Sequence, residues 1–365
     1  EHLDRYPVRE LWRALRGRGD VIAIPHIGGR RADLDHIDPR LCPVLEICSV
    51  HGHFEWFARD ALRRGLTVGF VGATDDHSGR PGASYPTADG HFPVKGGLAG
   101  VYAAATTRAA IFEALRARRC YATTGSRIVL EVTADGHWMG EAYRAVHAPT
   151  VRVRARGTGP LERVDILRGE QVVYAHTVAK PGRRLRIAWM GARTDTRGRQ
   201  TRWNGGLVLS EGRIVEAQPW TIDNPADWVR KTSEREVRWS STTAGNPNGV
   251  VLDLDAPETA EIAFRTDPAT FSFRPADVSD RPLAIACGGL EQQVVVDRAP
   301  ESDGTDAIEF TWQDPEPQPG RNAYWVRVVQ LDGAKAWSSP IFVRLASTHP
   351  RLAQGRTRPS VPSRT

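Results

Sequence analysis

The spacing of apolar residues changes near residue 126, and this change limits the folds that the chain can adopt. Before that point, helix-like spacing, as in the stretches that follow Pro7 and Phe54, alternates with short apolar runs. Such alternation is typical of β/α units. After it, short stretches alternate apolar and polar residues with a period of two, as half-buried strands do. We therefore predict an α/β region followed by an all-β region.

These patterns set the predicted boundaries. We assign residues 1–126 to a β/α domain and residues 127–345 to a β-sandwich domain, in which Asp332-Gly333 marks a hairpin. Residues 204–248 are rich in Gly, Asn, Pro and Thr and are expected to form a long insertion. Residues 346–365 contain no acids and are expected to be a disordered tail.

The charge pattern argues against several classes of partner. A net charge of +6 would invite a nucleic-acid role, but the 49 basic residues are spread along the chain among 43 acids. No stripe of basic and aromatic residues marks a nucleic-acid surface. No apolar run reaches the roughly 18 to 20 residues that cross a bilayer. We expect neither nucleic acid nor membrane as a partner, and the sequence leaves the oligomeric state open.

Cysteine and tryptophan usage adds two expectations. The four cysteines show no Cys-x-x-Cys spacing, so we expect buried free thiols and favour the cytoplasm, although a signal segment could precede Glu1. Nine of the eleven tryptophans follow residue 126. Buried tryptophans are the commoner outcome, whereas exposed ones could stack on sugars.

Ligand-type residues follow or interrupt three apolar runs in the first 80 residues. Thr74-Asp75-Asp76-His77 follows the run at 68–72, and a strand that ends in Asp-x-His places a carboxylate and an imidazole at one edge. His26 follows a run at 21–24 that we predict to be a strand. Glu46 lies inside a third run, where an unpaired carboxylate costs several kcal/mol. The sequence thus predicts a metal site at one strand edge.

Simpler interpretations exist for these residues. A single histidine such as His26 is more often a hydrogen-bonded turn residue than a ligand. The Asp75-x-His77 pair could be a helix cap followed by an exposed imidazole. It is the combination of the three runs that favours metal binding.

Four further residues are predicted to contact substrate. Arg80 lies three residues after His77 in a turn, where its guanidinium could bind a phosphate through two hydrogen bonds. Lys95 precedes a Gly-Gly pair, and His51 and His53 form a His-Gly-His stretch. The simpler interpretation of each is a solvated surface residue.

The motif order resembles a known superfamily. Pro25-His26, Leu45-Glu46-Ile47 and Asp75-x-His77 resemble the later motifs of the PHP (polymerase and histidinol phosphatase) metallohydrolases. The stretches at 76–86, 96–98, 114–125 and 336–343 look like the branch catalogued as domain of unknown function 3604. This resemblance implies a distorted β/α barrel that holds two or three divalent ions, Zn, Mn or Fe, for phosphoester hydrolysis.

The resemblance also implies roles for single residues. His26, Asp75 and His77 match metal ligands, and Glu46 matches a glutamate that is either a ligand or a residue behind one; Asp75, His77 and Glu46 would be catalytic. The superfamily's first His-x-His motif has no counterpart here. The chain is therefore expected to be the C-terminal part of a longer protein, with half of the metal site upstream and little or no activity of its own.

The sequence thus predicts a metal-dependent hydrolase, most directly a phosphoesterase that uses metal-activated water on a small phosphorylated or anionic substrate. Two alternatives stay open. One is an amidohydrolase-like site that acts on a C–N or C–O bond. The other is a non-catalytic binding module with a degenerate site.

Overall fold

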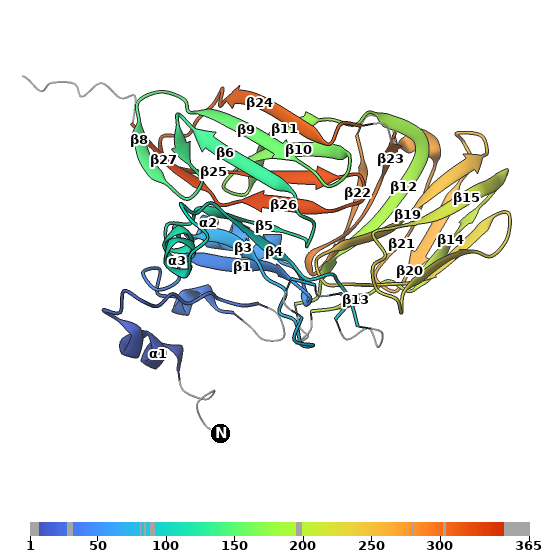
Figure 1. Ribbon diagram of the computed structural model, residues 1–365. Coiled ribbons are helices and arrows are strands. Elements are labelled where there is room, and N and C mark those ends of the chain that lie inside the picture. Colours follow the sequence, from blue (N-terminus) through green and yellow to red (C-terminus); the bar gives the residue numbers. More distant parts are fainter. Residues whose placement is uncertain are drawn as a thin grey trace, which may run out of the picture.

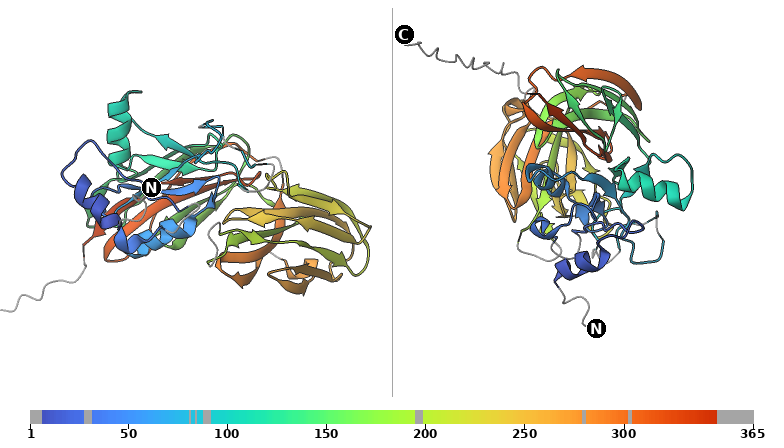
Figure 2. Two further views of the ribbon diagram at one scale, coloured as in Figure 1. Left: turned by 90° about the horizontal axis from the view of Figure 1, so that it is seen from below. Right: turned by 90° about the vertical axis from the view of Figure 1, so that its left-hand side faces the viewer.

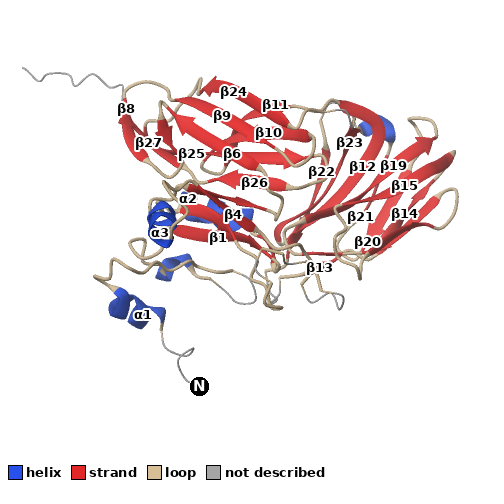
Figure 3. Ribbon diagram, viewed as in Figure 1, coloured by secondary structure: helices blue, strands red, loops and turns tan. Residues whose placement is uncertain are grey.

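The computed structural model describes residues 7–27, 32–80, 82–83, 85–87, 92–194, 199–278, 281–301 and 304–346. Over these residues the chain is mostly β-strand with three α-helices, and the strands form several open sheets (Figures 1 and 3). The predicted β/α barrel is therefore wrong, whereas the β-rich character is confirmed. The tail predicted at 346–365 lies outside the described residues beyond Ala346.

One β/α unit is present near the N-terminus. Helix α1 (Val8–Leu15) comes first, followed by β1 (Val44–Ser49), β2 (Gly52–His53), α2 (Glu55–Arg63) and β3 (Gly69–Gly72). Strands β1 and β3 pair in parallel, as strands joined by a helix can. Strand β2 folds back on β1 as a short antiparallel partner.

The next two strands depart from the barrel pattern. Helix α3 (Arg108–Arg116) connects β4 (Leu98–Val101) to β5 (Cys120–Thr123), and Thr107 caps it by accepting a hydrogen bond from the Ala110 backbone at 3.2 Å. Yet β4 and β5 pair antiparallel, and β5 pairs next with β26 (Lys335–Ser338), with Thr123 opposite Ala336. A strand from the far end of the chain thus takes the place that a parallel barrel neighbour would need.

This pairing builds an eight-stranded sheet, with a four-stranded sheet beside it. The first has the order β11-β10-β25-β26-β5-β4, with β27 and β8 added alongside, and the second has the order β24-β9-β6-β7. Their remaining strands are β6 (Val129–Ala134), β7 (His137–Trp138), β8 (Ala142–Ala145), β9 (Thr150–Arg156), β10 (Leu161–Arg168), β11 (Gln171–Thr177), β24 (Ala307–Gln313), β25 (Gly320–Gln330) and β27 (Ile341–Leu345). The predicted hairpin at Asp332-Gly333 is confirmed, since β25 and β26 pair across it.

The eight-stranded sheet contributes to two cores. Apolar side chains such as Val153 and Val328 fill the space between it and the four-stranded sheet. A second core joins α2, β1 and β3 to the same sheet, where Phe70 meets the buried Trp325 ring edge-on at 5.6 Å between centroids. The β/α unit therefore buries a face against a β-sheet rather than against the further helices that a barrel would supply.

The sheets and helices described so far form the main lobe of the molecule. Residues 181–300 form a second lobe beside it (Figures 1 and 2). Two five-stranded sheets, β15-β19-β12-β23-β22 and β16-β17-β14-β20-β21, share one core, in which Trp189 and Trp239 stack at 4.6 Å. Its strands are β12 (Pro181–Ala192), β13 (Thr201–Arg202), β14 (Gly205–Leu209), β15 (Arg213–Trp220), β16 (Trp228–Lys231), β17 (Glu236–Ser240), β18 (Thr242–Thr243), β19 (Pro247–Asp255), β20 (Ile262–Thr266), β21 (Thr270–Phe273), β22 (Leu283–Gly288) and β23 (Leu290–Pro300).

The predicted burial of tryptophan is confirmed for Trp189, Trp203, Trp239, Trp325 and Trp337, whereas Trp138 and Trp228 are partly exposed. In the described part of the chain, no helix is long and apolar enough to cross a bilayer.

A loop of the second lobe packs directly against β2. The His53 backbone N–H donates to the Ala244 carbonyl at 2.9 Å, and the Gly245 N–H donates to the Gly191 carbonyl at 3.0 Å. Gly245 has a φ of +88°, and a Cβ there would lie 1.8 Å from the His53 carbonyl oxygen. Only glycine lets the two backbones approach this closely.

We expect Gly245→Ala to lower the free energy of unfolding by about 2 kcal/mol or more, because a clash adds to the cost of the left-handed backbone. Gly320→Ala is the matched control. Gly320 also has a φ of +88° but has open space around its Cβ position, so only the backbone cost of about 1 kcal/mol applies. Equal losses in urea-induced unfolding of the two variants would show that the close approach contributes nothing.

Candidate metal centre

The parallel pair β1 and β3 brings two ligand-type residues to one edge. His51 lies two residues beyond the end of β1, and Asp75 lies three residues beyond the end of β3. Parallel strands end at the same edge of a sheet, so local sequence and register together place these side chains near each other. The register pairs Cys48 with Gly72 at this end.

His26 reaches the same place from a third segment. Residues 21–27 form neither strand nor helix, so the strand predicted at 21–24 is wrong. The segment is tied to its neighbours by hydrogen bonds from Ala23 N–H to the Leu41 carbonyl at 2.7 Å and from Glu46 N–H to the Pro25 carbonyl at 3.2 Å. The second of these bonds fixes His26 beside β1.

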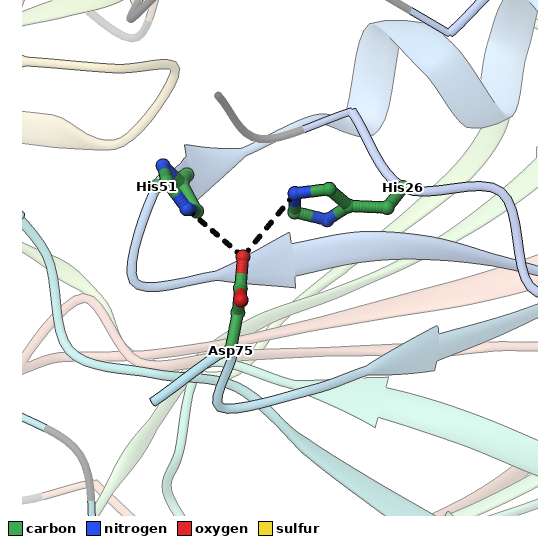
Figure 4. Close-up of side chains that lie close together, drawn as sticks. All are labelled: His26, His51 and Asp75. Carbon is green, nitrogen blue, oxygen red and sulfur yellow. Dashed lines mark ion pairs between the residues drawn. The ribbon is translucent and has the colours of Figure 1, made fainter. Parts of the chain in front are cut away.

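The three side chains point toward one another (Figure 4). The Nε2 atom of His26 lies 3.2 Å from Asp75 Oδ2, and the Nε2 atom of His51 lies 2.9 Å from the same oxygen. Their ligand atoms all lie within 4.8 Å of one another. Two ligands bound about 2.0–2.1 Å from a tetrahedral ion lie roughly 3.3 Å apart. The spacing therefore fits a single small divalent ion.

Asp75 has two features of a functional residue. Its φ of +46° is unusual for a residue with a side chain, and such backbone conformations cluster at binding sites. Its Oδ2 atom is buried and makes no hydrogen bond among the described residues, despite the two nearby imidazole nitrogens. An orphaned buried carboxylate oxygen is costly, and a cation between these atoms would satisfy it.

Glu46 lies behind His26, because His26 Nδ1 is 2.8 Å from Glu46 Oε1. An ionised carboxylate can only accept, so Nδ1 carries the proton and, in the neutral ring, Nε2 presents a lone pair toward Asp75. The same hydrogen bond is the main reason that the pKa of His26 is raised. Carboxylates in this position orient a metal-binding imidazole and increase its basicity. Of its two predicted roles, Glu46 thus has the geometry of the residue behind a ligand.

We expect Glu46→Gln to weaken binding of a divalent ion about 10- to 100-fold while leaving saturation at the same stoichiometry, because the ligand atoms remain but His26 loses its orientation. A competitive titration against a chelating dye would measure this. Glu113→Gln on the exposed side of α3 is the control and should have no effect. An affinity that is unchanged in Glu46→Gln would contradict this role.

His77 occupies the outer side of the same carboxylate. Its Nε2 lies 3.5 Å from Asp75 Oδ1, and its side chain is 55% exposed. Its ring packs on Phe92 at 4.5 Å between centroids, and Phe92 also meets the ring of His51. Among the described residues, His26, His51 and Asp75 are the group at mutual ligand distance. His77, which the sequence predicts to be a ligand, therefore lies beside this group, whereas His51, predicted to contact substrate, is part of it.

The remaining predicted residues lie in different surroundings. Arg80 is exposed and donates to Ser78 Oγ at 3.3 Å and, through its backbone, to Asp76. The ammonium of Lys95 lies 5.7 Å from the centre of the Tyr85 ring. Burial lowers the pKa of His53 to about 3, so this ring is neutral. His53 and Lys95 line a separate cavity.

The comparisons with known proteins fit part of this description. Residues 86–147 match the family model described as protein of unknown function (DUF3604). The match supports the resemblance to DUF3604 seen in the sequence and includes Lys95, α3 and β5, whereas His26, His51 and Asp75 lie before the matched residues.

Two further comparisons cover longer stretches of the chain. An uncharacterized protein of Chlamydia pneumoniae is 26% identical over 204 residues, which cover 46% of this chain and 31% of that protein, so the chain matches about a third of its curated relative. The solved structure of BcpA, the major pilin subunit of Bacillus cereus, is 12% identical over 59% of this chain and 65% of its own, with a TM-score of 0.10. A TM-score this low carries no argument about the fold.

Proposed function

We propose that this DUF3604-like chain belongs to a metal-dependent hydrolase that cleaves a phosphoester with metal-activated water. The supporting observation is the orphaned buried oxygen of Asp75 between two imidazole nitrogens. Three protein ligands also leave a fourth position on a tetrahedral ion for water, which is the arrangement of catalytic rather than structural sites. Membership of the PHP superfamily is part of the same proposal and rests on the motifs alone.

Each residue has a distinct part in this reaction. A divalent ion held by His26, His51 and Asp75 would lower the pKa of water and stabilise negative charge on the phosphoryl oxygens. Glu46 keeps the proton on His26 Nδ1. His77, exposed beside Asp75, can carry a proton on Nε2 to the leaving oxygen. A bond would form between the water oxygen and phosphorus as the ester P–O bond breaks. The leaving oxygen would take the proton from His77, and the proton released by the water would return to His77.

The first experiment is metal analysis of the purified chain. We expect about one equivalent of Zn, Mn or Fe after gel filtration, because the three ligands lie around one point; the resemblance implies two or three ions for a complete site. Absence of any bound ion, even after reconstitution with each metal, would reject the proposal and favour a non-catalytic binding module.

The second experiment distinguishes the reaction class. We expect the metal-loaded chain to hydrolyse phosphomonoesters or phosphodiesters slowly, and not amides. Slow turnover is expected because a single ion would act where related sites use two or three. Cleavage of amides or lactones without phosphoester hydrolysis would favour the amidohydrolase-like alternative. Arg80, three residues after His77, is the candidate contact for the phosphate.

A further inference from the structure

A cavity of about 190 Å³ lies where three parts of the fold meet. The main lobe supplies His53 and Lys95, the second lobe supplies Thr221, Asp223 and Asn246, and the β25–β26 hairpin supplies Asp332. One water needs about 10–15 Å³ of such space, so the cavity has room for several waters. It therefore fits one small polar molecule rather than a chain.

The walls of the cavity are held firmly. Thr221, with a φ of +54°, donates from Oγ1 to the Pro247 carbonyl at 2.6 Å, and Trp220 Nε1 donates to the Leu331 carbonyl at 2.9 Å. The hairpin tip presses so closely on this turn that a Cβ on Gly333 would lie 2.1 Å from the Thr221 methyl group. A cavity fixed by contacts of this kind is formed before a ligand arrives.

Charged groups of both signs meet at this cavity. Desolvation raises the pKa of Asp223, Lys95 acts to lower it, and Asp332 adds to the rise, so Lys95 and Asp332 both lie within electrostatic reach of Asp223. Two carboxylates and one ammonium leave an excess of negative charge. A phosphate or carboxylate ligand would therefore be repelled, and the best ligand carries no negative charge.

The uncharged lining supplies hydrogen-bonding groups as well. Thr124, Ser126 and Thr221, which carry hydroxyl groups, are among the lining residues. His53 Nδ1 is buried and has no hydrogen bond among the described residues, although its ring lines the space. Unpaired buried nitrogen is costly unless a ligand meets it. Closely spaced acceptors and donors of this kind match a molecule whose hydroxyls both donate and accept.

We propose that this cavity binds a neutral, polyhydroxylated ring of monosaccharide size. The stretch His51-Gly52-His53 runs from the metal centre to the cavity, so one short segment contributes to both places. A substrate with a sugar in the cavity and a phosphoester at the ion would use both. That the ring is part of the substrate rests on the proposed function, whereas binding of the ring in the cavity does not.

The test is calorimetric titration of the metal-free chain with D-glucose, D-galactose and D-mannose, and separately with inorganic phosphate. We expect saturable binding of at least one hexose and no binding of phosphate. Asp223→Asn should weaken hexose binding about 10-fold or more, because a charged hydrogen bond is lost. Asp223 is exposed at the rim, so the variant should fold.

Two control variants show whether weaker hexose binding results from the loss of Asp223 at the cavity or from a change elsewhere. Asp227→Asn, in the same loop, removes a carboxylate that accepts a hydrogen bond from the Thr242 backbone at 2.9 Å, and should leave hexose binding unchanged. Asp75→Ala should also bind hexose normally, since it changes only the metal centre. No saturable binding of any hexose, or equal binding by Asp223→Asn and the unaltered chain, would overturn the inference. Hexose binding by a chain that never holds metal would instead reject only the proposed function.

Discussion

Asp75→Ala is expected to lower the affinity for a divalent ion by at least about 100-fold, so that the protein emerges from gel filtration without metal. The reason is geometric. Asp75 Oδ2 lies 3.2 Å from His26 Nε2 and 2.9 Å from His51 Nε2, and its removal leaves two imidazole ligands with no negative charge to offset that of the ion. Loss of a residue that orients a metal ligand already lowers metal affinity about 10- to 100-fold, and loss of the ligand itself should lower it further.

Asp76→Ala is the matched control for this experiment. Asp76 is the next residue in the chain, but its carboxylate turns toward its own loop and accepts a hydrogen bond from Ser78 Oγ at 2.8 Å. This variant should bind one equivalent of metal with an affinity close to that of the unaltered chain. Circular dichroism would verify that both variants fold. If Asp75→Ala retained stoichiometric metal, or if both variants lost it equally, the assigned centre would be wrong.

Glu55→Gln is expected to lower the free energy of unfolding by about 3–5 kcal/mol, the usual cost of breaking a buried ion pair from one side. Glu55 is 8% exposed and accepts hydrogen bonds from Arg327 at 2.7 Å and Arg59 at 2.6 Å through Oε1, and from Trp337 Nε1 at 2.8 Å through Oε2. It therefore ties the start of α2 to β25 and β26. Glutamine has the same shape but leaves the guanidinium groups without their shared anion.

Glu309→Gln is the control with the same chemistry at the surface. Glu309 pairs with Arg152 and Arg154, all exposed, and such pairs contribute little to stability because water and salt screen them. Urea-induced unfolding of the two variants should thus differ by several kcal/mol. Equal decreases in the free energy of unfolding would show that the charged groups of Glu55, Arg59 and Arg327 are solvated.

The pH dependence of stability should reveal the same network of charges around Glu55. Burial acts to raise the pKa of Glu55, but Arg327, Arg59 and Lys335 outweigh it and hold the pKa well below its usual value. A carboxyl whose pKa is depressed in the folded state stabilises fully above its unfolded pKa and loses that contribution as the pH falls toward the folded pKa. The unaltered chain should therefore lose more stability below about pH 4.5 than Glu55→Gln does. Parallel losses in both would contradict this assignment.

Local sequence predicted much of the candidate site. His26, Glu46 and Asp75 were recognisable because each adjoins or interrupts an apolar run, where a polar group needs a partner. The sequence predicts substrate contact rather than metal binding for His51, although it too follows an apolar run, because a His-Gly-His stretch in a loop is often only solvated. What separates His51 from His77 is the distance of each ring from a carboxylate oxygen, and no local pattern encodes that distance.

The prediction of a β/α barrel is wrong for a related reason. The β/α spacing before residue 126 describes single elements, and those elements exist as α2 and α3 with the strands beside them. Periodicity shows that a strand has an apolar face, but it does not show which partner covers that face. Trp325 and Trp337 cover it here, and both come from strands at the other end of the chain.

The sequence by itself determined which residues prefer strands, where the Asp332-Gly333 hairpin turns and which polar side chains interrupt apolar runs, because these depend on neighbours within a few positions. Only the tertiary structure decided that β5 pairs with β26, that His51 joins His26 and Asp75, and that a loop of the second lobe meets β2 beside a polar cavity. These three features form when segments that are distant in the sequence bury their surfaces against one another. The free energy gained by this burial depends on all of these segments together, so no single stretch of the chain encodes it.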